Sequence, residues 1–143
     1  MTAISTEIRN ILEGGGLAHL TTLNADGSPQ VTIVWVGLDG TDIVAGHLAE
    51  LHKVTNMRND QRVALSIEAG TTNNMGLDEY LVIYGTATIT DGGAPELLQR
   101  LAHTYIGPDA KFPPMDNPPA GFITRITIDR VAGVGPWAPM GWS

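Results

Sequence analysis

The spacing of apolar residues along the chain changes between the period of a helix and that of a strand. Between positions 4 and 12 apolar residues recur at intervals of three and four, which predicts an amphipathic helix over residues 3–13 that ends at three consecutive glycines. A spacing of three predicts a short helix over residues 48–59. A third helix is expected to begin at Pro95 and to continue to Tyr105, because proline is favoured in the first turn of a helix.

Six segments rich in β-branched and aromatic residues predict strands between and after these helices. They cover residues 17–23, 30–38, 41–46, 62–69, 79–90 and 121–134. The first three are joined by short turn sequences and are therefore expected to form a meander. Short strands with few helices favour closure of the sheet into a barrel, because closure leaves no exposed edge. The predicted fold is mainly β with short helices, an antiparallel Greek-key or meander β-barrel in one domain spanning residues 1–143.

Composition narrows the classes of function. The chain has 143 residues, 43% of them hydrophobic and 16% charged, which is typical of one soluble domain. Eight Lys and Arg against fifteen Asp and Glu give a net charge of −7, which argues against partners such as nucleic acid or an anionic membrane surface. The absence of cysteine excludes disulfides and thiolate chemistry. Neither a signal peptide nor a membrane-spanning apolar run is recognised, so a cytoplasmic location is expected.

Basic residues are densest between positions 52 and 62 of this acidic chain. On the expected helix Lys53 and Asn56 are three residues apart, and His52 and Asn56 are four apart, so each pair shares a face. Ammonium, imidazole and amide donors near a helix start suit a phosphate or carboxylate, since free backbone N–H groups add to the attraction. The alternative is a solvated helix surface whose charges pair with neighbouring carboxylates.

Other site chemistries find little support. The four histidines lack the HxxxH and HExxH spacings, no GxSxG motif is present, and the acidic residues are dispersed through turns. We therefore expect no metal site, no Ser/His/Asp triad and no pair of catalytic carboxylates. These absences leave the basic segment as the best candidate for a binding site.

Two tryptophans and one proline-rich stretch are further candidates for the lining or cover of a binding pocket. Trp35 lies inside a predicted strand, where packing in the core is the expectation. Trp137 follows the last strand in an apolar tail, which is expected to dock over a groove or onto a second subunit. The proline-rich stretch 107–119 is expected to be an extended loop or lid.

The succession of segments also resembles a known family. The stretch LAHLTTLNADGSPQVTIVWVGLDG, followed by HKVTNMRNDQRVALSIE and YLVIYGTATIT, is similar to the split β-barrel flavin-binding superfamily. This is the pyridoxamine 5′-phosphate oxidase-like group, and the resemblance is greatest to its actinobacterial branch of oxidoreductases that use the deazaflavin coenzyme F420. It covers roughly residues 5–134. Its most specific part is Lys-x-x-Asn-hydrophobic followed by Asp-x-Arg-Val-Ala, over residues 53–64.

The resemblance implies a homodimer with two equivalent cofactor sites at the subunit interface, each lined by both chains. It implies that Lys53 holds the phosphate-bearing side chain of the cofactor. His52 stands where relatives often have Arg, and Asn56 belongs to the same motif.

Five further cofactor-binding residues follow from the same resemblance. Gly46 and His47 stand where relatives supply a hydroxyl residue near the ring or the ribityl chain. The backbone groups of Thr32 and Val34 would lie within reach of the polar edge of the ring. Trp137 would cap the site.

Departures from the family pattern favour one cofactor over another. The FMN-using pyridoxamine phosphate oxidases carry Arg and Lys in the strand equivalent to VTIVWV, which here contains neither. The resemblance therefore implies an F420-dependent reductase that transfers a hydride to an unsaturated small-molecule substrate. No catalytic side chain is assigned, because in such reactions the cofactor carries the difficult chemistry. The alternatives are an FMN-binding oxidase or reductase and a non-catalytic carrier of F420 or flavin.

Overall fold

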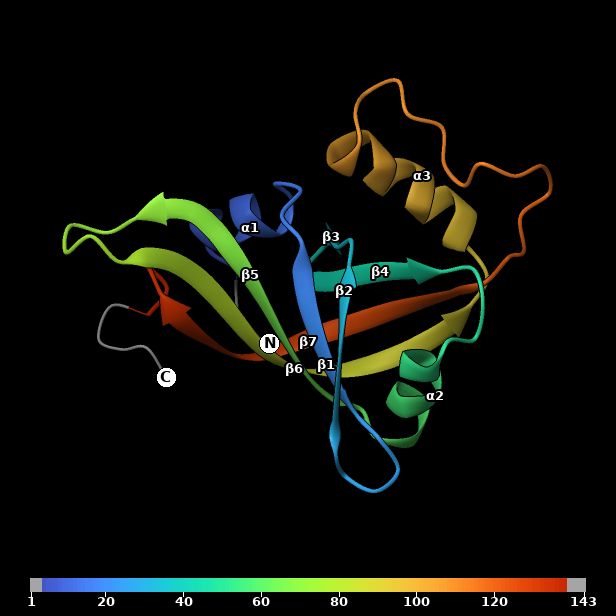
Figure 1. The fold of residues 1–143 in the computed structure, drawn as a ribbon, viewed down its shortest axis with the longest axis horizontal. Helices are drawn as coiled ribbons and strands as arrows, with labels where there is room; N and C mark the ends of the chain where they lie inside the picture. The colour runs from blue at the N-terminus through green and yellow to red at the C-terminus, as the bar shows by residue number, and fades with distance from the viewer. Residues whose placement is uncertain (1–3, 139–143) are drawn as a thin grey trace.

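The computed structural model describes residues 4–138, which form a seven-stranded sheet with three helices around it (Figure 1). The strands are β1 (Ala18–Leu23), β2 (Pro29–Val34), β3 (Gly37–Asp39), β4 (Asp42–His47), β5 (Arg62–Thr72), β6 (Asp78–Asp91) and β7 (Phe122–Val134). The helices are α1 (Thr6–Leu12), α2 (His52–Asn59) and α3 (Ala94–Tyr105). None of the helices between residues 4 and 138 is long and apolar enough to cross a membrane.

The strands lie in the order β2-β1-β5-β6-β7-β4-β3, and every neighbouring pair is antiparallel. The two edge strands, β2 and β3, are separated along the chain only by Trp35 and Val36. Because consecutive Cα atoms are about 3.8 Å apart, the sheet must curve until its two edges meet at this crossing. This arrangement is a split β-barrel, and it confirms the mainly β fold expected from the sequence.

Two expectations about the first strands were wrong. Residues 30–38 were expected to form one strand, but β2 pairs with β1 through Val34 and Ala18, whereas β3 pairs with β4 through Gly37 and Val44. The first three predicted strands therefore do not form a meander, since β2 and β4 are not neighbours in the sheet. The apolar run continues without interruption across the crossing, so hydrophobicity alone does not reveal that the chain changes partners.

The hydroxyl of Tyr105, at the end of α3, forms hydrogen bonds with the backbone at this crossing. Its Oη accepts a hydrogen bond from the backbone N–H of Val36 at 3.0 Å and donates to the carbonyl oxygen of Gly16 at 2.8 Å. These bonds supply partners for backbone groups that the sheet leaves unpaired at its split. One side chain thus joins the crossing segment to the start of β1.

The interior of the barrel is filled by branched aliphatic side chains. Those at most 1% exposed include Leu20, Ile43, Leu65, Ile83 and Ile126. Burying each such side chain contributes roughly 1.5–3 kcal/mol. Leu12 of α1 and Met57 of α2 join the same cluster. Figure 1 shows these two helices near opposite ends of β1, so they close the barrel while α3 packs outside, against β4.

We predict that Tyr105→Phe lowers the free energy of unfolding by about 1–3 kcal/mol, because the N–H of Val36 and the carbonyl of Gly16 lose a hydrogen-bond partner. Chemical denaturation measures the change. Tyr84→Phe is the matched control, since the ring of Tyr84 is 38% exposed on the outer face of β6. Equal stability of the two variants would contradict this role for Tyr105.

Candidate functional site

A groove with a volume of about 310 Å³ opens between β2, the end of β4, the start of α2 and the side of α3. Val34, Gly46, His47 and Lys53, all selected from the sequence, line it. Most of its other lining side chains are apolar. A pocket of this composition, with one cation and few polar groups, is suited to an amphiphilic ligand that carries an anionic group.

Lys53 supplies the charge of this groove. Its Nζ donates a hydrogen bond to Oγ1 of Thr32 on β2 at 3.2 Å. Its side chain is half-buried, and burial lowers the pKa of the ammonium group below its ordinary value. No carboxylate in the part of the chain that the structure describes forms an ion pair with it. A half-buried ammonium without a counter-ion gains stability when a phosphate or carboxylate binds.

The start of α2 adds to this attraction. Leu51 is the N-cap residue, and its side chain offers no hydrogen bond to the first N–H groups of the helix. Leu51 and Lys53 both line the groove, so the start of α2 lies beside it, where the positive end of the helix dipole favours an anion.

A polar network fastens α2 to the hairpin of β1 and β2. The side-chain amide nitrogen of Asn56 lies 3.1 Å from Oγ1 of Thr22, 2.9 Å from Oδ1 of Asn24 and 3.2 Å from Oε1 of Gln30. Nε2 of His52 lies 2.8 Å from the same Oδ1 of Asn24. Asn56 is 4% exposed, and neither Asn56 nor His52 lines the groove. The structure thus places both behind Lys53, where they fix the helix that carries it.

His47 ends β4 on the opposite wall and is only 3% exposed. Its Nε2 lies 2.8 Å from Oγ1 of Thr124. Burial, together with the positive charge of Lys53, lowers the pKa of His47 to about 4. The imidazole is therefore neutral at pH 7, and among residues 4–138 Lys53 is the sole cation that lines the groove.

Glycines set the position of this wall. A Cβ at Gly46 would lie 3.1 Å from Cγ of Leu98, so glycine lets β4 approach α3 closely. Gly121, with φ of +64°, packs against the backbone of His47, and a Cβ there would lie 2.1 Å from its carbonyl oxygen. Any larger residue at Gly121 would displace the backbone of His47.

Trp137 lies elsewhere. Its indole Nε1 donates to the carbonyl oxygen of Tyr80 at 3.2 Å, and it borders a depression beside α1 and the β5–β6 hairpin. Trp137 therefore does not line the Lys53 groove of its own chain.

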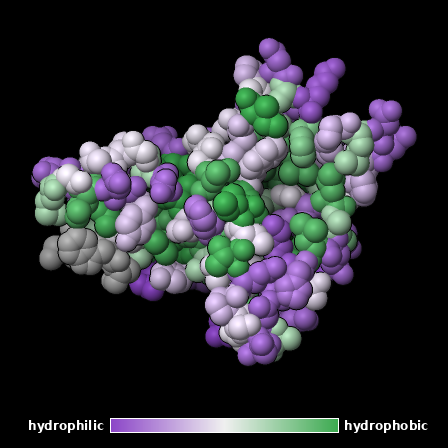
Figure 2. Space-filling model, in the orientation of Figure 1, coloured by the Kyte–Doolittle hydropathy of each residue, from purple (hydrophilic) through white to green (hydrophobic). Residues whose placement is uncertain are grey.

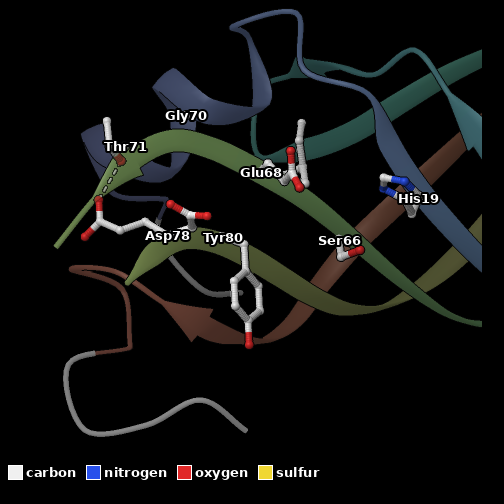
Figure 3. Close-up of a pocket in the computed structure, with 9 residues that line it drawn as sticks. His19, Ser66, Glu68, Gly70, Thr71, Asp78 and Tyr80 are labelled. Carbon is white, nitrogen blue, oxygen red and sulfur yellow. Dashed lines mark hydrogen bonds between the residues drawn. The ribbon is translucent and has the colours of Figure 1, made fainter. Parts of the chain in front are cut away.

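The depression beside Trp137 has a volume of about 790 Å³, and a neighbouring one along the hairpin has about 520 Å³, so both are larger than the Lys53 groove. Figure 3 shows Glu68 on β5 and Asp78 on β6 in this hairpin depression, with His19 of β1 at its other end. The carboxylates would repel a phosphate, so volume alone does not make this the better candidate. Among residues 4–138 there is no group of three or more His, Cys, Asp or Glu side chains placed to hold a metal ion.

Two aromatic residues of the groove were not predicted. Trp35 packs against a small core cluster under α3, as expected, but it is also partly exposed and lines the groove beside Phe112. It stacks on Tyr105 with ring centroids 5.3 Å apart, and Phe112 lies tilted against it at 5.2 Å. The position of Trp35 follows from the crossing between β2 and β3. Phe112 belongs to the loop 107–119, which has neither helix nor strand and whose path no periodicity reveals.

Comparison with known proteins places the chain in a family. The sequence pattern that defines the pyridoxamine 5′-phosphate oxidase family matches residues 4–135. The chain belongs to this family. Its members commonly are oxidoreductases with a flavin-binding type of fold. A search of curated protein sequences finds no match.

Solved structures share the fold of this family member. An F420 reductase is 24% identical, with a TM-score of 0.67, over 87% of this chain and 94% of that one. Protein Rv2991 from Mycobacterium tuberculosis is 23% identical, with a TM-score of 0.67, over 91% and 83% of the two chains. HupZ from Group A Streptococcus is 18% identical, with a TM-score of 0.65, over 97% and 100%. At these identities the likeness concerns the fold.

We predict that the stability of the protein falls by about 2 kcal/mol between pH 7 and pH 5 through His47 alone. The unfolded imidazole takes up a proton below its ordinary pKa of 6.5, whereas the folded one does so only near 4, so acid favours the unfolded chain in that interval. Urea denaturation at both pH values measures the effect. His47→Gln should lose this pH dependence and His52→Gln should keep it. The same slope in both variants would contradict the assignment.

Proposed function

We propose that this member of the family is an F420-dependent oxidoreductase, which transfers a hydride from reduced F420 to an unsaturated small molecule. The observation that carries the proposal is Lys53, a half-buried cation without an ion-pair partner among the described residues, at one side of an otherwise apolar groove. F420 combines a flat ring with a phosphate-bearing side chain. The ring suits the apolar part of the groove, and the phosphate suits the ammonium of Lys53. β2 carries no Arg or Lys, which favours F420 over FMN.

The proposal assigns a role to each candidate site residue, whether it lines the groove or lies behind it. Lys53, with the N–H groups at the start of α2, holds the phosphate-bearing chain. Val34 of the edge strand β2 lines the groove, and the hydroxyl of Thr32 lies beside the ammonium of Lys53, so the proposal places both residues near the polar side of the ring. Gly46 and His47 face the ring or ribityl chain from β4. His52 and Asn56 orient Lys53 through α2 rather than touch the cofactor.

Hydride transfer from a bound cofactor requires few catalytic side chains. Reduced F420, when bound, supplies a hydride to an activated C=C or C=N bond, and solvent or one nearby polar group supplies the accompanying proton. The groove residues contribute by orienting the reactants and excluding water from them. The neutral imidazole of His47 leaves the charge of Lys53 as the attraction for the anionic side chain.

We propose a homodimer whose partner covers the outer face of β1 and β2. Leu17, Val31 and Ile33 on this face are 53%, 61% and 53% exposed. Figure 2 shows hydrophobic residues at the surface in the middle of this side of the molecule. Ile33 also borders the groove, so a partner on this face would lie next to the site. Trp137 would reach a cofactor site only in the other subunit, since it lies outside the groove of its own chain.

Titration of the purified protein with F420 and, separately, with FMN tests the cofactor. We expect F420 to bind more tightly than FMN, and Lys53→Ala to weaken F420 binding by about 1.5–3 kcal/mol, the range for a hydrogen bond to a charged group. Lys111→Ala is the matched control, because Lys111 is the only other lysine and is exposed in the loop 107–119. Failure of F420 to bind, or equal binding by both variants, would contradict the proposal.

Turnover separates the enzyme from its alternatives. Consumption of reduced F420 on addition of an unsaturated acceptor identifies a reductase, whereas tight binding without consumption identifies a carrier. A yellow purified protein that prefers FMN would identify the flavin-dependent alternative. Each outcome is read directly from the absorbance of the cofactor.

A further inference from the structure

Arg58 lies in the last turn of α2 and contacts parts of the chain on the β4 side of the groove. We propose that Arg58 is a positioning residue of the cofactor site, which ties α2 to the ends of β6 and β7 and so sets the separation of Lys53 from His47. The effect on cofactor binding rests on the proposed function. The effect on the two side chains rests on the contacts of Arg58 alone.

Three contacts hold the guanidinium group. Its Nε donates a hydrogen bond to Oε1 of Glu50 at 2.9 Å, and its Nη2 lies 3.6 Å from Oδ1 of Asp91. Its central carbon lies 5.2 Å from the centre of the Phe122 ring. Glu50 belongs to the segment between β4 and α2, Asp91 ends β6 and Phe122 begins β7. Figure 1 shows α2 beside the end of β6, so one side chain joins the helix to two strands and a loop.

These contacts reach the backbone that positions the β4 wall of the groove. Phe122 is paired with His47 in the ladder between β7 and β4. Glu50 immediately precedes Leu51, the N-cap residue of α2, which lines the groove. Arg58 therefore connects the end of the helix both to its own first turn and to the strand beside His47.

The helix has a second anchor, and the two anchors act on different walls. Asn56 and His52 bond to the hairpin of β1 and β2, and β2 carries one wall of the groove. Arg58 acts on the other wall, and Lys53 lies on the helix between them. Without the contacts of Arg58 the helix would keep its bonds to the hairpin, whereas its distance from the β4 wall would depend on apolar packing alone.

The contacts of Arg58 are suited to fixing a position rather than to raising stability. Its side chain is 38% exposed, and ion pairs at such sites contribute little to the free energy of unfolding. A guanidinium is planar and bonds to carboxylates in its plane while its face lies over an aromatic ring, so such contacts restrict its orientation. Loss of the guanidinium should therefore move α2 without unfolding the protein.

The imidazole of His47 reports this movement. Its pKa is lowered to about 4, first by burial and then by the charge of Lys53, and no other charged group among residues 4–138 contributes to that shift. If α2 moves away from β4, burial decreases and the ammonium lies farther off. Both changes raise the pKa toward its ordinary value of 6.5.

An NMR titration of His47 in cofactor-free protein, together with F420 binding, tests the proposal. Arg58→Met keeps an aliphatic chain and removes the guanidinium. We expect the pKa of His47 to rise from about 4 in this variant, and the affinity for F420 to fall roughly three- to tenfold through misplacement of Lys53. The urea midpoint at pH 7 should change little.

Two further variants separate positioning from a through-space effect of charge. Glu50→Ala removes an anion, which by charge alone would lower the pKa of His47 and tighten F420 binding. Loss of the anchor predicts the opposite in both measurements. Arg62→Met is the matched control, because among the described residues Arg62 pairs only with Asp60 and does not line the groove. It should leave the pKa and the affinity unchanged.

The outcomes for Arg58 and for the proposed function are distinguishable. An unchanged pKa of His47 in Arg58→Met, a lowered pKa in Glu50→Ala, or equal effects of Arg58→Met and Arg62→Met would overturn the positioning role. A lower urea midpoint with an unchanged pKa would show structural support only and would overturn it too. Failure of F420 to bind the wild-type protein would overturn the proposed function. The titration of His47 needs no cofactor, so it would still decide whether Arg58 positions Lys53.

Discussion

The crossing at Trp35 and Val36 is the constraint on which the rest of the structure depends. A seven-stranded sheet whose edge strands are adjacent in sequence must close on itself, and the backbone at the split needs partners from outside the sheet. Tyr105 supplies them from α3, and the loop after α3 then brings Phe112 beside Trp35. The contacts that close the barrel therefore also build one wall of the groove.

The opposite side of the groove depends on a second set of polar contacts. Asn56 and His52 share Asn24 as a partner, which anchors α2 on the hairpin below it and sets the position of Lys53. A short helix of eight residues gains little stability by itself, so this anchoring and the burial of Met57 decide where the ammonium lies. The groove thus combines an electrostatic side, built by α2, with an apolar side, built by α3 and its loop.

The sequence was sufficient for the fold class and for most elements because those depend on local periodicity and turn residues. It also selected Val34, Gly46, His47 and Lys53, which meet in the groove, through the resemblance and the rarity of lysine. It did not reveal the break within residues 30–38, since pairing partners are chosen by contacts distant in sequence. Phe112 could not be predicted either, because the loop that carries it is held by Gln99 rather than by any repeating pattern.

The central claim is that the groove beside Lys53 is the cofactor site, and amide NMR spectra recorded during titration with F420 test it most directly. The account predicts shifts at β2 around Thr32 and Val34, at Gly46 and His47, and at the start of α2. It predicts little change at Thr71 and Asp78 on the β5–β6 hairpin, which line the acidic depression. Shifts confined to that hairpin would contradict this assignment and would indicate that F420 binds in the acidic depression instead.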